Sequence, residues 1–226
     1  MRPSSPAPTL HHMAATETRL LLLGTVMLFE PVNGYQLRRE LLSWQVEDWA
    51  HVNPGSIYSG LATLARQGNL ARHDLVDGSR EVAVYTSTPL GRREFEKLWR
   101  AAVETPDILS PLPFHTGMAL MPLMSRTAVR EALRARLANL DANARAQLAQ
   151  ERPAEAVPPH VLVLADLWMG MGQTEREWLV NLMARVDRGD FGLRGEPADW
   201  EAPADDPGWQ MANDRQRYLE LISRKG

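Results

Sequence analysis

The sequence predicts a mostly α-helical chain that carries one short β-hairpin. Helical patterns separated by turn residues come first, and two strand-like runs joined by an Asp-Gly turn follow them. The second half of the chain repeats apolar residues at spacings of three and four over two long stretches, as amphipathic helices do. In chain order, the segments are residues 16–29, 35–42, 53–67, 70–76, 81–87, 88–103, 125–148 and 160–188.

The third predicted helix has two different sides. Asn53 is suited to cap this helix and Pro54 to occupy its first turn. Ile57, Leu61 and Leu64 recur on one side, which we expect to be buried. The other side is small and polar and has no acidic residue; it consists of Ser56, Ser59, Gly60, Thr63 and Gln67.

A β-hairpin is predicted directly after this helix. Asp77 and Gly78 join the two strand-like runs, and glycine adopts the positive φ of such a tight turn without a steric penalty. Thr88 and Pro89 then begin a fourth helix. Three helices followed by a hairpin are the ground plan of a winged helix-turn-helix.

This ground plan favours contact with double-stranded DNA. A helix that enters the major groove needs a low, polar outer side, because its backbone must approach the base edges. The acid-free side of residues 53–67 meets that need. Arg66, Arg72 and Arg80 flank it and are candidates for phosphate or minor-groove contacts.

The charge composition is close to balanced. The 226 residues include 25 Lys and Arg and 28 Asp and Glu, a net charge of -3, which excludes a wholly cationic DNA-coating protein. Residues 1–103 hold 11 basic and 10 acidic residues, whereas residues 104–226 hold 14 and 18. A polyanionic partner is therefore expected on the amino-terminal part.

Several function classes find no support in the sequence. There is no cysteine, which excludes disulfides and thiolate metal sites and suits a reducing, cytoplasmic location. The most apolar run, residues 20–29, has about half of the ~20 residues that a membrane-spanning helix needs. Because no phosphate-binding glycine loop, Gly-x-Ser-x-Gly turn or paired-histidine motif is present, we expect neither an enzyme nor a bound metal or cofactor.

Five short segments occur in an order and spacing that are more informative than any one of them. They are LLG at 22–24, NGYQL at 33–37, NPGSIYSGL at 53–61, LARQGNL at 64–70 and YTSTPLG at 85–91. Through these segments the chain resembles the PadR family of transcriptional regulators from about Leu20 to Leu98.

The resemblance implies a DNA-binding dimer, usually a repressor, that a small molecule or another signal releases. By the same resemblance Tyr35, Ser56, Tyr58 and Ser59 fall where the family contacts DNA, and Arg80 falls on the wing. The wing departs from the family pattern because it has fewer glycines and basic residues and an acidic residue beside its tip. We therefore expect few phosphate contacts per chain and a shallow salt dependence.

We divide the chain into four parts. Residues 1–15 are rich in Pro and Ser and are expected to be a disordered tail, and residues 16–103 to be the winged-helix domain. Residues 104–124, interrupted by prolines, are expected to be a connector to a helical dimerisation and effector domain, residues 125–226. Apolar residues keep their phase across a glycine pair, which favours one kinked helix over residues 160–188 rather than two helices.

The expected partners are a roughly palindromic DNA operator, a second copy of the chain and a small-molecule effector. A two-fold dimer would place two reading helices about 34 Å apart, which is one turn of DNA. The alternative is a protein-interaction adaptor that keeps the winged fold without binding DNA. The predicted ligand-binding residues are Trp99, Met118 and Trp168, and the predicted DNA-binding residues are Tyr35, Asn53, Ser56, Tyr58, Ser59, Thr63, Arg66 and Arg80.

Overall fold

The structure, a computed structural model, describes residues 10–50, 52, 54–148, 157–198, 201, 203, 206 and 208–225. The chain forms two compact units. Unit 1 comprises Met1–Trp99 and Glu201–Gly226, and unit 2 comprises Arg100–Trp200. The last helix therefore belongs to the unit in which the chain begins.

Unit 1 has the predicted winged helix-turn-helix, and the described chain as a whole is mostly helical, which confirms the predicted fold class. The first helix, α1 (Leu10–Phe29), buries its apolar run and begins within the predicted tail rather than at Thr16. Residues 10–15 include leucine, methionine and alanine, which favour helix, and no proline that would end one. Residues 1–9 lie outside the described part.

Two helices form the helix-turn-helix pair. They are α2 (Gly34–Ser43) and α4 (Pro54–Arg66), and a short helix that the sequence analysis did not predict, α3 (Val46–Trp49), lies between them in the chain. α2 begins with a capping box, in which the side chains of Asn33 and Gln36 accept hydrogen bonds from each other's backbone N–H groups. The start of α2 is therefore held in place.

The hairpin belongs to a three-stranded antiparallel sheet with the strand order β1-β3-β2. β2 (Leu70–Asp77) and β3 (Arg80–Ser87) form the wing, and Gly78 in its turn has a φ of 64°. β1 (Val32–Asn33), in a stretch predicted as a turn, pairs with β3, so the sheet has one strand more than predicted. α5 (Pro89–Glu104) follows the sheet.

Two glycines allow close packing inside unit 1. A Cβ on Gly60 of α4 would lie 2.3 Å from Leu22 Cδ1 of α1, and a Cβ on Gly91 of α5 would lie 2.0 Å from the carbonyl oxygen of Asn69. The sequence analysis placed Gly60 on the outer side of its helix. That prediction is wrong because the contact between α1 and α4 uses this position.

Polar contacts join the same elements around the apolar core. Arg19 of α1 donates hydrogen bonds to Glu94 of α5 (3.2 Å) and to Gln67 (2.6 Å) and Asn69 (2.8 Å), which follow α4. The core consists of side chains with at most 2% of their surface exposed and includes Leu20, Leu21, Leu22, Leu23, Val26, Leu37, Leu41, Ile57, Leu61, Leu64, Phe95 and Trp99.

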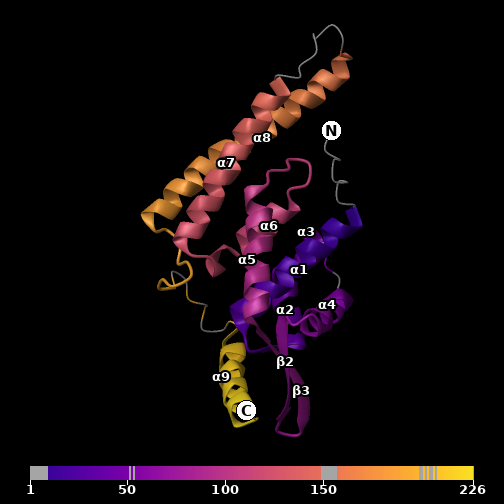
Figure 1. Cartoon of the computed structure of the whole chain (residues 1–226), viewed down its shortest axis with the longest axis vertical. Coiled ribbons are helices and arrows are strands. Elements are labelled where there is room, and N and C mark those ends of the chain that lie inside the picture. Colours follow the sequence, from indigo (N-terminus) through magenta and orange to yellow (C-terminus); the bar gives the residue numbers. More distant parts are fainter. Residues whose placement is uncertain are drawn as a thin grey trace. The chain divides into compact units, whose positions relative to one another are not determined.

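Unit 2 is built on a pair of long helices. α7 (Arg126–Leu148) and α8 (Pro159–Arg188) run side by side in opposite directions (Figure 1). α8 is one continuous helix across its glycine pair, which confirms the prediction of one helix rather than two.

The stretch predicted as a connector contains helical structure. α6 (Leu112–Ala119) and a 3-10 turn, η1 (Met121–Leu123), lie within residues 104–124. Pro111 caps α6 and Pro113 lies in its first turn, where the N–H that proline lacks has no helical partner. These prolines therefore mark the start of a helix rather than interrupt one.

Arg136 of α7 lies at the centre of unit 2, with 1% of its side chain exposed. Its guanidinium donates hydrogen bonds to the carbonyl oxygens of Val103 (3.1 Å) and Thr105 (3.0 Å). It also pairs with the Glu175 carboxylate of α8, and its Cζ lies 3.7 Å from the ring centroid of Phe114 on α6. One buried side chain thus joins the end of α5 to three other helices.

The last helix, α9 (Gly208–Lys225), packs beside the wing within unit 1 (Figure 1). These residues were predicted as part of the helical domain, residues 125–226. Alternate residues give one face of the wing an apolar surface, and the apolar side of α9 covers it. This cluster, buried or partly buried, consists of Leu75, Val82, Val84, Tyr218, Leu221 and Ile222.

None of the helices in the described part of the chain combines the length and the apolar character that crossing a membrane requires.

Candidate nucleic-acid interface

The outer side of α4 is small, polar and free of acidic residues, as predicted. Ser56 and Thr63 are half-buried at its margins rather than at its centre. Because nothing on this side carries negative charge, the helix itself does not repel a phosphate backbone. The exposed residues are Gly55, Tyr58, Ser59, Ala62 and Arg66.

Two hydroxyl groups of α4 have partners on their own helix. Ser59 Oγ donates to the carbonyl oxygen of Ser56 (3.0 Å), and Arg66 Nη2 lies 3.5 Å from Thr63 Oγ1. A base acceptor would have to replace the Ser59 hydrogen bond, whereas a base N–H could donate to the lone pairs of Ser59 Oγ without replacing it. Ala62, in the middle of the exposed side, keeps the surface low so that the backbone can approach.

A cleft of about 630 Å³ opens between α2, α4, the wing and α9. Tyr35 at the start of α2, Tyr58 of α4 and Arg80 of the wing all line it. Tyr35 is 64% exposed and Tyr58 is 48% exposed. The Tyr58 ring packs over Gly34, where an added Cβ would lie 2.9 Å from Tyr58 Cε1. Three of the predicted DNA-binding residues thus meet in one place, two of them presenting phenol rings.

The charges on the wing are partly paired. Arg72 lies 2.8 Å from the Asp74 carboxylate, and the hydrogen bond from Arg72 to Asp74 raises the pKa of this already cationic guanidinium. Arg80 forms no ion pair within the described part of the chain, and it faces the cleft near Glu81 and Asp77. Arg80 is therefore the cation of the wing that remains available to a phosphate.

The predicted DNA-binding residues divide into three groups. The cleft brings one group together, and a second runs along the exposed side of α4. Asn53 lies outside the described residues. Gly55 and Ala62 are exposed on the same side of α4 but were not among the predicted residues. Both lie opposite Ile57, Leu61 and Leu64 on a helix of 3.6 residues per turn, so helical periodicity would have identified them. The residues of the first two groups are Tyr35, Tyr58 and Arg80, then Ser59 and Arg66, with Ser56 and Thr63 at the margins.

The three predicted ligand-binding residues lie in different surroundings. Trp99 is completely buried in the core of unit 1, so no face of its ring is open to a ligand. Met118 lines an open apolar groove of about 960 Å³ between α6 and α8, together with Phe114 and Trp178. Trp168 lines a separate pocket of about 530 Å³ in unit 2.

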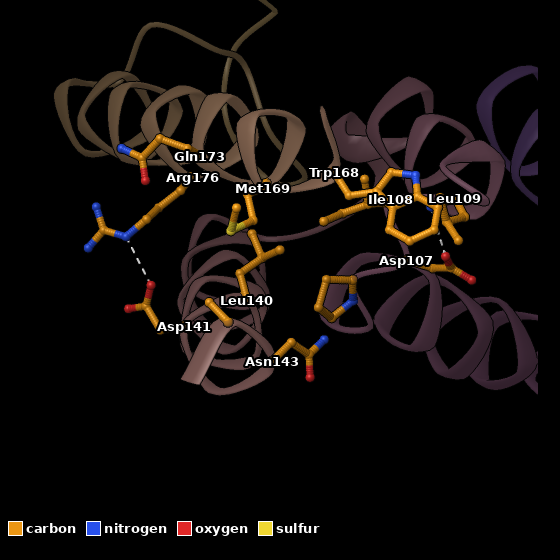
Figure 2. A pocket seen from close by; sticks show the side chains of 13 residues that line it. Asp107, Ile108, Leu109, Leu140, Asp141, Asn143, Trp168, Met169, Gln173 and Arg176 are labelled. Atoms are coloured by element: carbon orange, nitrogen blue, oxygen red, sulfur yellow. Dashed lines mark hydrogen bonds and ion pairs between the residues drawn. The ribbon is translucent and has the colours of Figure 1, made fainter. Parts of the chain in front are cut away.

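The Trp168 pocket is apolar with charged groups at its edge. Figure 2 shows the Trp168 ring beside Ile108 and Leu109, with Met169 and Leu140 adjacent. At the edge of the pocket Arg176 Nε donates to Asp141 Oδ1 (2.9 Å). Such a lining suits a flat, largely apolar molecule. Among the described residues no group of three or more His, Asp or Glu side chains could hold a metal ion.

The model of the Transcriptional regulator PadR-like family matches residues 22–97. Similar solved structures include PadR of Bacillus subtilis in complex with operator DNA, with 19% identity, 75% of this chain and 98% of that chain covered, and a TM-score of 0.34. They also include the PadR-like transcriptional regulator BC1756 from Bacillus cereus (16% identity, 81% and 99% covered, TM-score 0.33). The protein smu.1604c from Streptococcus mutans UA159 is a third (16% identity, 74% and 98% covered, TM-score 0.33).

No curated protein sequence matches the chain. The segment that the family model matches begins in α1 and ends in α5, so it contains the helix-turn-helix pair and the whole wing. Over residues 22–97, the chain is similar to the PadR-like family of transcriptional regulators.

Proposed function

We propose that this protein is a sequence-specific DNA-binding regulator that acts as a dimeric, ligand-responsive repressor. The observation that carries the proposal is the acid-free exposed side of α4, which lies next to a cleft lined by Tyr35, Tyr58 and Arg80. Ser59 would read base edges in the major groove, and the two tyrosines and Arg80 would hold the phosphate backbone or the minor groove.

The dimer is supported by apolar surface that unit 2 leaves uncovered. α8 buries Leu179, Leu182 and Val186 and exposes a second apolar side that unit 2 does not cover. A second copy that packs its own α8 there would remove this surface from water and fix the spacing of the two reading helices. The exposed residues are Leu164, Leu167, Trp168, Met171 and Trp178.

The effector site is proposed in the Trp168 pocket. A flat apolar molecule there would stack on Trp168 and separate the Ile108 loop from α8. α8 also carries the exposed apolar side on which the second copy would pack. A ligand that moves α8 would therefore bind two different dimer arrangements with different affinity. The ligand would then shift the spacing of the reading helices and weaken DNA binding.

The experiment that tests DNA binding uses a labelled duplex of random sequence at low salt, followed by selection of tightly bound duplexes from a random pool. We expect the wild-type chain to bind the random duplex measurably at low salt and to enrich a roughly palindromic site. No binding under these conditions would favour the adaptor function instead.

Two variants relate the binding to the interface. Arg80→Ala should weaken binding to every sequence by a similar factor, because a phosphate contact carries no sequence information. Ser59→Arg should remove the preference for the selected site, because a long cation at the centre of the α4 face blocks entry to the groove. Unchanged footprints for both variants would overturn the proposal.

A further inference from the structure

α9 forms one wall of the cleft that contains Tyr35, Tyr58 and Arg80. The family match ends at residue 97 and therefore carries no information about this helix. We propose that α9 is a second DNA-contacting element of unit 1 and that Arg217 binds a backbone phosphate, an inference that rests on the proposed function. The α9 side chains that line the cleft are Gln210, Asp214, Arg217 and Tyr218.

α9 is fixed to the elements that would meet DNA. The Tyr218 hydroxyl accepts a hydrogen bond from Asn33 Nδ2 (2.9 Å), and Asp214 Oδ2 accepts one from Gln36 Nε2 (2.8 Å). Asn33 and Gln36 are the capping-box residues on either side of the exposed Tyr35. Together with the apolar contact on the wing, these bonds hold α9 in one position relative to Tyr35.

The Arg217 side chain is oriented but retains donors. Its Nη2 lies 2.7 Å from Asp77 Oδ2 and 2.9 Å from Asp214 Oδ1, so one nitrogen serves both carboxylates. Nε and Nη1 of Arg217 have no hydrogen-bond partner within the described part of the chain, and half of the side chain (52%) is exposed. Since a guanidinium carries five N–H donors in a rigid fork, the remaining donors suit a phosphate group.

α9 carries more basic than acidic residues. Residues 208–225 include four Lys and Arg and two Asp and Glu. On the wing, Arg72 is already paired with Asp74, which leaves Arg80 to meet the backbone. Asp77, the strand partner of Arg80, is the same residue whose carboxylate pairs with Arg217, and both arginines line the cleft.

The test measures the affinity of the full chain for a random-sequence duplex as a function of salt. Arg217→Gln should weaken binding about tenfold at roughly 50 mM salt and lower the slope of log K against log salt by about 0.9 per bound chain. The matched control is Arg215→Gln, which removes the same charge from the same helix at an exposed position outside the cleft. The control should change the affinity less than about twofold.

A further variant separates a phosphate contact from a structural role. Asp77→Asn removes one of the two carboxylate partners of Arg217 and leaves the arginine and Asp214 in place. If Arg217 binds phosphate, this variant should bind DNA as tightly as wild type or more tightly. If Arg217 acts only through its pair with Asp77, both variants should bind equally weakly, and the inference is overturned. Equal slopes for Arg217→Gln and Arg215→Gln would also overturn it, whereas a wild-type chain without DNA affinity would instead remove the proposed function.

Discussion

The two units bury charge in opposite ways. In unit 1, Glu17 of α1 is 8% exposed, and its Oε2 has no hydrogen-bond partner among the described residues. In unit 2, Arg136 is 1% exposed and is bonded to two carbonyl oxygens, a carboxylate and an aromatic face. A fully bonded buried charge holds elements together, whereas one with an unsatisfied atom raises the free energy of the folded state. The buried charge of unit 2 is therefore expected to stabilise its unit more than that of unit 1.

The units also differ in the apolar surface that they leave exposed. In unit 1, α9 covers the apolar face of the wing. In unit 2, one side of α8 remains open although it carries two tryptophans, Trp168 and Trp178. Unit 1 thus covers the apolar face of its wing, while unit 2 exposes the side of α8 on which the proposed dimer rests.

The largest effect is expected for Arg136→Ala. The change leaves Glu175 and two buried carbonyl groups without their partner, and breaking a buried pair in this way costs about 3–5 kcal/mol of unfolding free energy. Urea denaturation at fixed protein concentration measures it. The control, Arg134→Ala on the exposed side of α7, should cost less than about 0.5 kcal/mol. Equal losses for both variants would show that unit 2 does not depend on its central cation.

The next effect concerns association. Leu167→Lys places a charge on the open side of α8, where the side chain is 58% exposed. Since a lysine buried in an interface without a partner is strongly unfavourable, the dimer should weaken by about 100-fold. The control is Val76→Lys on the wing of unit 1, where the valine side chain is 63% exposed. This variant should leave the affinity of the dimer unchanged. Light scattering after size exclusion measures both, and a dimer that persists in Leu167→Lys would remove the proposed interface.

Substitution of a glycine by alanine should change the stability of the two units by a smaller amount and in opposite directions. Gly91→Ala would push a methyl group into the Asn69 carbonyl of unit 1 and cost about 1–3 kcal/mol. Gly170→Ala in the middle of α8 meets nothing within 4 Å in its own chain and should stabilise unit 2 by about 1 kcal/mol. Thermal unfolding of both variants checks the signs. A harmless Gly91→Ala would contradict the close approach of α5 to the end of α4.

The parts of the fold that could be predicted from the sequence are those with local signals. Asp77 and Gly78 specify the turn of the wing, and the spacing of Ile57, Leu61 and Leu64 specifies the buried side of α4. The contact of Gly60 with α1 could not be predicted, because a glycine on a polar side looks the same whether it faces water or a neighbouring helix.

The position of α9 is a second feature without a local signal. Tyr218 meets Asn33 across 185 positions of sequence, and nothing near either residue announces the other. The predicted site was incomplete for this reason: Tyr35, Tyr58 and Arg80 could be named from the family resemblance, but the wall that α9 adds to their cleft could not. Long-range pairing, rather than local pattern, decides what surrounds the site.

The smallest effect is a pH dependence of opposite sign in the two units. Burial raises the pKa of Glu17, whereas hydrogen bonds from the Arg126 guanidinium lower the pKa of Glu196 in unit 2. Because the pKa of Glu17 is raised in the folded chain, Glu17 lowers the free energy of unfolding of unit 1 as pH rises above the unfolded-state pKa of about 4.3. Because the pKa of Glu196 is lowered in the folded chain, Glu196 stabilises unit 2 above that pH, and this contribution is lost as pH falls through the folded-state pKa.

Two glutamine variants therefore should differ in sign at neutral pH. Glu17→Gln should be slightly more stable than wild type at pH 7, and Glu196→Gln slightly less stable. When urea denaturation is repeated below about pH 4, the Glu17 difference should approach zero, because the carboxyl is then protonated in both states. The Glu196 difference should be lost only as pH falls further, through the lowered folded-state pKa of Glu196. If Glu17→Gln were instead less stable at pH 7, the bonds of the Glu17 carboxylate would outweigh the cost of its burial. The contrast between a carboxylate with an unsatisfied oxygen in unit 1 and fully bonded charges in unit 2 would then no longer hold.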